Sequence, residues 1–310
     1  MELTNIKVGV LAGGVSEERD ISLLSGRQVF SALERKNIKA EFIDIKTSEN
    51  NEIKKIIKAA QIDLAFIALH GSFGEDGKIQ TILQEIPLAY TGSGPKASLF
   101  AMDKIIAKER FSQSGVKTAF YRLATAKNYN YKGLTYPVVV KPSHSGSSFG
   151  ISIVDSKEKI KEALKESFKF SESAIIEDYI KGRELTVGIL GETPLAVVEI
   201  VPQGKYFDFK NKYTKGNSVF VVPAKLDKKI YKQLQQLALQ AHKALGCRDF
   251  SRVDIKLKGD LPYVLEVNSI PGLTERSLLP LSASACGISF DELIFIFVEK
   301  ALSRRKKVLK

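Results

Sequence analysis

The first hundred residues alternate short apolar runs with a helical pattern, and this alternation restricts the fold more than any other feature. Apolar runs at residues 6–11, 42–45 and 64–69 predict strands, and apolar residues recur at helical spacing between Ile21 and Leu33. The run at 64–69 is apolar throughout, which is typical of a strand covered on both faces. The chain is therefore predicted to begin with a small doubly wound α/β unit around a parallel sheet.

Two further regions follow this unit. A helix is expected between Pro95 and Gly115, with the proline in its first turn and the glycine just past its end. The elements expected after it are strands at 137–141, 151–154 and 174–177 around a helix at 157–170, then strands at 184–190 and 195–201, a polar stretch at 203–218, a helix at 228–245 and a hairpin at 252–268. The predicted fold class is α/β, with three α/β or α+β domains at residues 1–97, 98–178 and 179–310.

The charge of the chain narrows the choice of partner. The formal net charge is +12, and six basic residues but no acidic one follow Glu299, so we expect a solvated, frayed tail there. Tryptophan is absent, and no helical pattern interleaves basic with aromatic residues, which argues against nucleic-acid binding. A small anion such as ATP remains compatible with the basic balance.

Neither a membrane nor an oxidising compartment is expected. The longest apolar runs, such as residues 293–298, have about a third of the length needed to cross a bilayer. The N-terminal residues lack the pattern of a signal peptide, so we expect a cytoplasmic protein. Cys247 and Cys286 have no CxxC partner, and both are expected to be buried as small hydrophobic side chains.

The hairpin at residues 252–268 carries the most informative local pattern. If Asp260 lies at the centre of the turn, Asp254 faces Glu266 and Arg252 faces Asn268, while Val253, Ile255, Leu265 and Val267 point to the other side. Opposed carboxylates repel unless a cation lies between them, and an all-oxygen set suits magnesium. The alternative is a solvated face on which Arg252 neutralises both acids.

Two glycine-rich segments are candidates for phosphate binding. In VKPSHSGSSFG, from Val140, an apolar strand ends in Lys141 and enters a glycine and serine loop whose N–H and hydroxyl groups suit phosphate, although a plain surface turn is the alternative. The pattern from Gly92 to Ala97 satisfies GxGxx(G/A) and would imply a dinucleotide site. Because Pro95 removes one N–H group from it, we interpret this pattern as a linker turn.

Polar residues also follow two of the predicted N-terminal strands. The loop AGGVSEERD, from Ala12, places Glu17 and Glu18 where α/β sheets bind ligands, and these acids suit the ammonium group of an amino acid. His70 closes another strand at the same edge of the sheet. Solvated loop charges and a structural histidine are the alternatives.

Taken together, the motifs of this chain resemble those of the D-alanine:D-alanine ligases of the ATP-grasp superfamily. The resemblance covers nearly the whole chain. It rests on LAGGVSEERDIS from Leu11, ALHGSFGEDG from Ala68, YTGSGPKAS from Tyr90, MDK from Met102, VKPSHSGSSFG, IIEDYIKGRELTV from Ile175, KNKYTKGNSVFVVPAKL from Lys210, SRVDIKL from Ser251 and EVNSIPGLTERSLLP from Glu266.

The resemblance implies an ATP-grasp fold, with ATP held between the central and C-terminal domains. It implies that ATP phosphorylates one D-alanine and that a second attacks the acyl phosphate, giving D-alanyl-D-alanine, ADP and phosphate for peptidoglycan synthesis. It also implies a homodimer. Another ATP-grasp ligase, a nucleotide-binding regulator and, on the Gly92 pattern alone, an NAD-dependent dehydrogenase are the rival interpretations.

The resemblance also assigns roles to residues. Glu18 and His70 would bind the first D-alanine, Arg252 and Gly272 the reacting oxygens, and Ser277 and Leu278 the second D-alanine. Ser147 would link Glu18 to Tyr213, and the tyrosine favours a dipeptide over a depsipeptide product. The residues assigned to ATP are Lys104, Lys141, Ser148, Glu177, Glu184 and Lys212. The residues assigned to two magnesium ions, with manganese as a substitute, are Asp254, Glu266 and Asn268.

Overall fold

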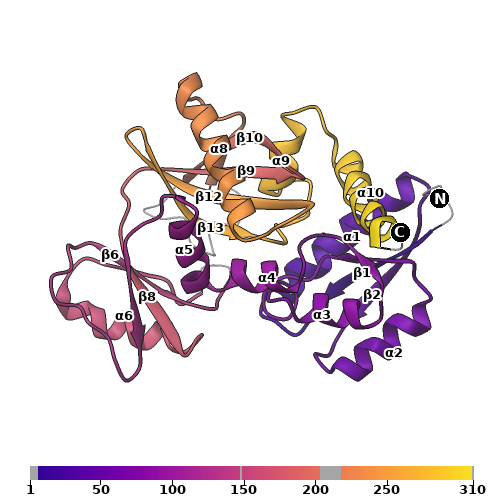
Figure 1. Ribbon diagram of the computed structural model, residues 1–310, viewed down its shortest axis with the longest axis horizontal. Coiled ribbons are helices and arrows are strands. Elements are labelled where there is room, and N and C mark those ends of the chain that lie inside the picture. The colour runs from indigo at the N-terminus through magenta and orange to yellow at the C-terminus, as the bar shows by residue number, and fades with distance from the viewer. Residues whose placement is uncertain (1–5, 147–148, 203–217, 309–310) are drawn as a thin grey trace.

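Three β-sheets are arranged around one central junction in the computed structural model, which describes residues 6–146, 149–202 and 218–308 (Figure 1). The first sheet has the order β2-β1-β3-β4, the second β5-β8-β6-β7 and the third β11-β10-β9-β12-β13. Helix α4 lies between the first sheet and the second in Figure 1, and α5 lies farther from the first sheet, beside the second. The expected α/β class with three α/β or α+β units is confirmed.

The first sheet is parallel and is covered by helices on both faces. Val8 and Val10 of β1 pack into a core shared with α1 and α10, while Ile43 of β2 packs into a second core with α2 and α3. The prediction of a doubly wound unit is therefore correct. Its elements are β1 (Lys7–Gly13), α1 (Arg19–Arg35), β2 (Lys39–Ile45), α2 (Asn50–Ala60), β3 (Leu64–Ile67), α3 (Lys78–Glu85) and β4 (Ala89–Tyr90).

The last helix, α10 (Phe290–Val308), returns to this first sheet, as the yellow ribbon beside α1 shows (Figure 1). Phe297 of α10 stacks on Phe250 with ring centroids 4.0 Å apart, and Arg304 donates to the Tyr90 backbone oxygen at 2.6 Å and pairs with Asp249. The expectation of a frayed tail from Lys300 onward is therefore wrong as far as Val308, because the helix continues and Arg304 is held by an ion pair.

A break at Asp103 divides the helix that was expected between Pro95 and Gly115. The structure has α4 (Pro95–Met102) and α5 (Lys104–Gln113), and Asp103 caps α5 by accepting from the backbone N–H groups of Ile105 and Ile106. The prediction of one continuous helix is wrong because an aspartate before an apolar run favours a helix start. Pro95 does open α4, and Gly115 follows α5 with a φ of 69°.

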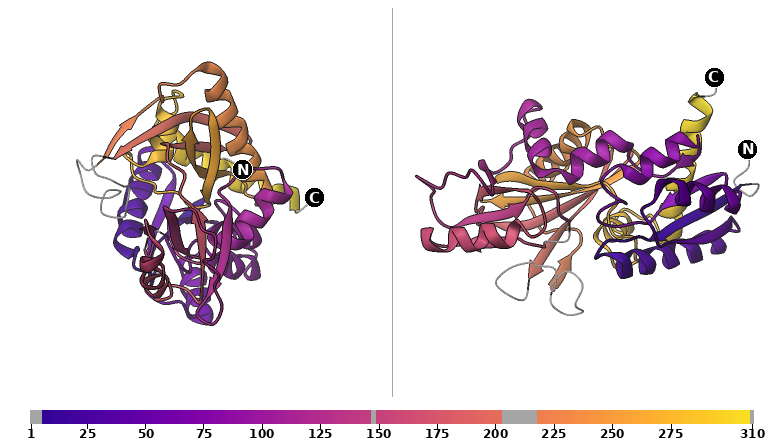
Figure 2. Two further views of the ribbon diagram at one scale, coloured as in Figure 1. Left: turned by 90° about the vertical axis from the view of Figure 1, so that its left-hand side faces the viewer. Right: turned by 90° about the horizontal axis from the view of Figure 1, so that it is seen from below.

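The second and third sheets are antiparallel. The second comprises β5 (Tyr121–Thr125), β6 (Val138–Pro142), β7 (Ser152–Val154) and β8 (Ser173–Asp178), with the 3₁₀ turn η2 (Lys157–Lys159) and α6 (Ile160–Ser167). The third comprises β9 (Arg183–Leu190), β10 (Thr193–Pro202), β11 (Ser218–Val221), β12 (Phe250–Lys258) and β13 (Leu261–Asn268), with α8 (Lys228–Ala244) and α9 (Leu278–Ser284). Figure 2 shows these two sheets close together at the end away from the N-terminus.

The third sheet carries a helix on each face. Val187 of β9 packs into the core formed with α8, whereas a Cβ atom on the next residue, Gly188, would lie 2.7 Å from Leu279 of α9. Cys247 is buried at the edge of the α8 core, as expected. Cys286 is exposed, so its expected burial is wrong: it follows α9 at the surface.

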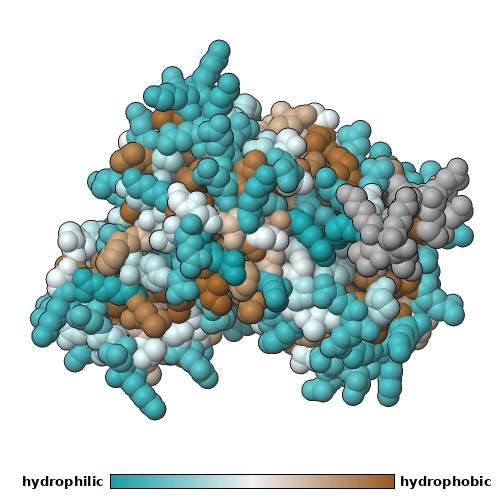
Figure 3. Space-filling view, viewed as in Figure 1, coloured by the Kyte–Doolittle hydropathy of each residue, from teal (hydrophilic) through white to brown (hydrophobic). Residues whose placement is uncertain are grey.

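The described surface is largely hydrophilic. On the face shown in Figure 3, hydrophilic residues cover most of α2 and α8, and hydrophobic residues lie in small groups between them. None of the helices in the described part of the chain is long and apolar enough to span a membrane.

Candidate active site

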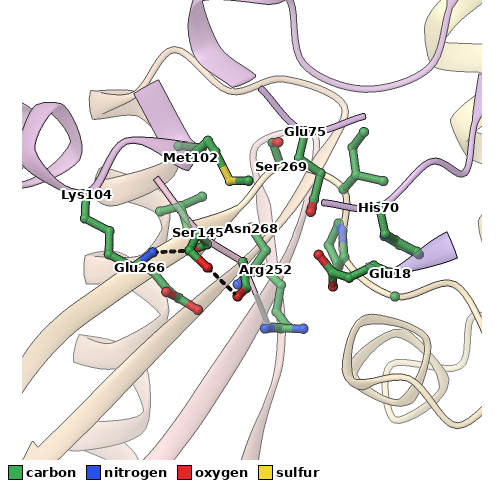
Figure 4. A pocket seen from close by; sticks show the side chains of 16 residues that line it. Glu18, His70, Glu75, Met102, Lys104, Ser145, Arg252, Glu266, Asn268 and Ser269 are labelled. Atoms are coloured by element: carbon green, nitrogen blue, oxygen red, sulfur yellow. Dashed lines mark hydrogen bonds between the residues drawn. The ribbon is translucent and has the colours of Figure 1, made fainter. Parts of the chain in front are cut away.

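One pocket lies at the junction and draws residues from all three parts of the chain. Figure 4 shows Glu18, His70 and Glu75 on one side, Lys104 and Ser145 on the other, and strand residues below. Its lining includes Glu18, His70, Glu75, Met102, Lys104, Ser145, Gly146, Arg252, Glu266, Asn268, Ser269 and Gly272. Seven residues predicted from sequence therefore meet in it: Glu18, His70, Lys104, Arg252, Glu266, Asn268 and Gly272.

The floor of the pocket comes from the β12–β13 hairpin. Its register pairs Asp254 with Glu266 and Arg252 with Asn268, as the alternation predicts. A bulge lies between this part and the turn, because Ile255 pairs with Val264 and the sequence of pairs skips Leu265. The bulge makes the expectation for Leu265 wrong: Val264 is buried in the α8 core, whereas Leu265 is only partly buried.

Arg252 neutralises one of the two opposed acids. Its Nε and Nη2 donate to the two carboxylate oxygens of Asp254 at 2.9 and 2.7 Å, and Asn268 Nδ2 donates to the same carboxylate at 3.2 Å. Thr186 Oγ1 donates to it at 2.6 Å. The alternative in which Arg252 neutralises both acids is confirmed for Asp254 alone, since none of the ion pairs found among the described residues involves Glu266.

The acids and the amide on this face suit a hard cation. Asp254, Glu266 and Asn268 offer carboxylate and amide oxygens on adjacent strands, which is the ligand chemistry that magnesium prefers. The residues therefore fit magnesium through two carboxylates and an amide.

Glu18 precedes α1 and is 7% exposed. Two glycines leave room for its carboxylate: a Cβ atom on Gly71 would lie 2.6 Å from Glu18 Oε2, and one on Gly146 would lie 3.0 Å from it. Gly71 also has a φ of 72°, which L side chains rarely adopt. Backbone segments after β3 and β6 therefore approach the same carboxylate from two sides.

His70 is 5% exposed beside Glu18. Burial, helped by the nearby Arg252 charge, lowers the pKa of its imidazole to about 4, although a hydrogen bond to the Ile270 backbone opposes this shift. Its Nε2 lies 3.0 Å from Ser25 Oγ. His70 is therefore neutral near pH 7 and is fixed in orientation.

Glu75 is a pocket residue that was not singled out from the sequence, although it lies within the ALHGSFGEDG motif. Burial and the charge of Glu18 raise the pKa of its carboxyl group, and the N–H of Gly71 donates to it at 2.8 Å. Its position only five residues after His70 could have indicated that Glu75 lies at the same edge of the sheet.

A buried ion-pair cluster lies next to the pocket, on β6, β8 and α5. Glu177, 2% exposed, pairs with Lys141 and, at 2.9 Å, with Lys108. Burial alone would raise the pKa of Glu177, but the two lysines lower it to about 2. Burial likewise disfavours the charge on Lys141, yet Glu177 keeps its pKa above the ordinary value. Lys108 was not predicted from the sequence.

The remaining predicted residues fall into two groups. Glu184 pairs with Lys256 at 2.7 Å, Ser277 Oγ would lie 2.9 Å from a Cβ atom on Gly272, and Leu278 packs with Val198. None of these three lines the pocket. Four further predicted residues, Ser147, Ser148, Lys212 and Tyr213, lie outside the described residues.

The Gly92 turn is held by protein groups. Its N–H donates to Asp249 at 2.9 Å and its carbonyl oxygen accepts from Arg248 Nε at 3.0 Å. These contacts support the interpretation of this segment as a linker turn. They argue against a dinucleotide site at Gly92, which was the only basis for the dehydrogenase alternative.

The chain is similar to proteins of one family along most of its length. Residues 46–93 match the family model for the D-ala D-ala ligase N-terminus, and residues 113–299 match that for the C-terminus. The chain is 41% identical over 302 residues to D-alanine--D-alanine ligase of Citrifermentans bemidjiense, covering 97% of each chain. It is also 41% identical to that of Clostridium botulinum, over 96% of this chain and 99% of the relative.

The fold agrees as well. The structure resembles the crystal structure of D-alanine--D-alanine ligase from Bacillus anthracis complexed with ATP, with a TM-score of 0.87 and 32% sequence identity. The match covers 98% of this chain and 99% of that one.

Proposed function

This chain belongs to the D-alanine:D-alanine ligase family, and we propose from that premise that its pocket joins two molecules of D-alanine at the expense of ATP. The ligase activity and ATP dependence follow from the family and from the fold it shares with an ATP-bound relative. The observation that carries the proposal is the meeting of Glu18, His70 and Arg252 in one pocket with Lys104 and Glu266.

The first step places the carboxylate of one D-alanine opposite the terminal phosphate of ATP. Glu18 binds the ammonium group of this D-alanine. His70 lies beside it and helps to orient the substrate, and because its imidazole is neutral it adds no competing positive charge. Lys104 and Lys141 hold the phosphates, while Glu177 and Glu184 contact the adenine and ribose. A carboxylate oxygen attacks the terminal phosphorus, ADP leaves, and D-alanyl phosphate forms.

The second step forms the peptide bond. The amine of the second D-alanine, held near Ser277 and Leu278, attacks the acyl carbon and loses a proton. The C–O bond to phosphate then breaks and phosphate leaves. The Arg252 guanidinium and the Gly272 N–H offset the negative charge that develops on the acyl oxygens. The roles that the family resemblance gives to Ser147, Ser148, Lys212 and Tyr213, which lie outside the described residues, are part of the same proposal.

Magnesium, or manganese in its place, supplies positive charge to the phosphate oxygens when bound. Asp254, Glu266 and Asn268 would hold two such ions, and their all-oxygen chemistry supports this assignment.

The organisation of the protein is part of the same proposal. We infer a substrate-binding unit at residues 1–97 and two ATP-grasp units at 98–178 and 179–310, assembled as a cytoplasmic homodimer that feeds peptidoglycan synthesis. The separate sheet in each range supports this division.

The test is phosphate release from ATP and magnesium, with the products identified by mass. We expect release with D-alanine and a D-alanyl-D-alanine product, no release with L-alanine alone, and little depsipeptide when D-lactate is added. Release with a different acid only would move the chain to another ATP-grasp activity.

A matched pair of variants locates the first substrate. Glu18→Gln removes a buried charge and should raise the KM for D-alanine by about tenfold or more. Glu17→Gln, the same change at the exposed neighbouring residue, should leave the KM unaltered. Equal effects at the two positions would contradict the ammonium site.

A further inference from the structure

Residues 143–146, in the glycine-serine loop after β6, and the start of α5 lie at the pocket together, and a side-chain pair joins them. Met102 and Lys104 line the pocket on one segment and Ser145 and Gly146 on the other. Asp103, which lies between the first two, and His144, which precedes the second two, do not line it. They face each other, with His144 Nε2 2.8 Å from Asp103 Oδ2.

Both ends of the histidine are engaged. His144 Nδ1 lies 2.8 Å from Ser143 Oγ, which in turn lies 2.9 Å from Ser171 Oγ and 2.7 Å from Ser173 Oγ. The imidazole therefore connects Asp103, through Ser143, to the hydroxyl groups of Ser171 and of Ser173 at the start of β8. A ring held at both nitrogens has one orientation.

The two oxygens of Asp103 have separate tasks. Oδ1 accepts from the backbone N–H groups of Ile105 and Ile106 at 2.8 and 3.1 Å and so caps α5, while Oδ2 faces His144. Lys104 joins the same two segments again. Its backbone N donates to Ser143 O at 2.9 Å, and its side-chain Nζ donates to Ser145 O. The pocket face of the loop is thus positioned relative to Lys104 by contacts on its outer side.

We propose that Asp103 and His144 are positioning residues which hold residues 143–146 against the N-terminus of α5 and so pre-order Lys104 and Ser145 for the phosphates of ATP. The inference rests on the proposed function. A loop rich in glycine and serine loses much conformational freedom when it is fixed around a ligand, and a contact that fixes it beforehand improves binding. His144 is 47% exposed, so the pair acts through geometry more than through net charge.

Four variants test the pair. Asp103→Asn keeps the Oδ1 cap and removes the acceptor for Nε2. His144→Asn keeps an amide near the Nδ1 position and loses the reach to Asp103, whereas His144→Gln places an N–H donor near the Nε2 position. Asp227→Asn is the matched control, because Asp227 caps α8 at 2.8 Å without a histidine partner.

The measurements are kcat, the KM for ATP and for D-alanine, the Kd for a non-hydrolysable ATP analogue, and the Tm. We expect Asp103→Asn and His144→Asn each to raise the KM for ATP and the analogue Kd by about tenfold, with kcat and the KM for D-alanine within about threefold. The double variant should be no weaker than either single one, and His144→Gln should recover most of the lost affinity.

Other results would overturn the proposal. These are unchanged ATP affinity in both single variants, additive losses in the double variant, a loss in His144→Gln as large as in His144→Asn, or the same loss in Asp227→Asn. A fall in Tm with no change in ATP affinity would assign the pair to folding alone. A wild-type protein that bound the analogue yet released no phosphate with D-alanine would refute the proposed function and leave the pair intact.

Discussion

Glu177 and Glu75 are the same chemical group on two sides of one junction, and their surroundings shift their pKa values in opposite directions. Glu177 has a lysine at each carboxylate oxygen, and its pKa falls to about 2 although burial opposes this. Glu75 lies beside Glu18, and burial together with that like charge raises its pKa. None of the ion pairs among the described residues involves Glu75.

The difference shows how neighbouring charges set the protonation of two buried carboxyl groups. The cluster around Glu177 is neutralised by the chain itself, so it serves as a fixed wall. On the other side, burial and the like charge of Glu18 favour the protonated form of Glu75, while the Arg252 charge opposes this. The following substitutions test this contrast.

The largest effect is expected for Glu177→Gln. It leaves Lys108 and Lys141 buried without their counter-charge, and should lower the free energy of unfolding by about 3–5 kcal/mol in urea titrations at pH 7. Glu184→Gln, which breaks the more accessible pair with Lys256, should cost less than about 1 kcal/mol. Equal losses for the two variants would show that burial of the Glu177 cluster does not increase its contribution to the free energy of unfolding.

The pH dependence of this loss has a definite sign. Because the pKa of Glu177 is depressed in the folded state, its contribution is present above the ordinary value of 4.5 and is lost as the pH falls toward 2. The stability difference between wild type and Glu177→Gln should therefore shrink below pH 4.5.

Glu266→Gln tests the carboxylate that lies between the two regions. It removes a charged oxygen from the set assigned to magnesium, and should lower kcat by at least about two orders of magnitude. The variant should unfold at nearly the wild-type temperature, since none of the ion pairs identified in the described part of the chain involves Glu266. Full turnover at ordinary magnesium concentrations would contradict the metal assignment.

Lys108→Met removes one of the two cations from Glu177 and keeps the volume of the side chain. Lys141 still neutralises the carboxylate, so we expect a loss of about 2 kcal/mol in the free energy of unfolding. Lys169→Met, which breaks a surface pair with Glu166, is the control and should fall within experimental error. If the two variants unfold alike, Lys108 is not part of the wall.

The smallest effect at low pH is expected for Glu75→Gln. Because Glu75 is protonated at pH 4 in the folded protein and largely protonated in the unfolded chain, the neutral amide should change the free energy of unfolding by less than about 1 kcal/mol at that pH. The wild type loses stability as the pH rises from 4.5 through the raised pKa, whereas the variant has no such loss. Unfolding at pH 5, 7 and 9 should favour the variant increasingly, and a reversed trend would mean that Glu75 is ionised.

The sequence predicts the parts of this site that depend on local periodicity. The alternation in β12 and β13 is enough to bring Asp254 opposite Glu266, and the apolar runs identify β1 and β3, whose ends carry Glu18 and His70. The bulge at Leu265 is invisible to such a pattern, because it inserts a residue without changing the residue types on either side.

The side chains that were missed depend on tertiary approach. Lys108 and Glu177 are 69 positions apart, and only the tertiary fold, which brings α5 near β8, turns them into a buried pair. The course of α10 could not be predicted either, since an apolar run of six residues does not reveal which of three sheets it will cover. Neither role of Asp103, as the cap of α5 or as the partner of His144, was predicted, because one helix was expected to run through this position.

The most direct test of the central claim follows the carboxylate oxygens of the first substrate. D-alanine labelled with ¹⁸O in both carboxylate positions is incubated with the protein, ATP and magnesium in unlabelled water, and the released phosphate is analysed by mass. If the carboxylate is activated by phosphorylation in this pocket, each phosphate should carry one ¹⁸O atom and the dipeptide carbonyl should retain the other. Phosphate without label, formed at the same rate, would mean that water accepts the phosphoryl group and that the pocket does not couple ATP to ligation.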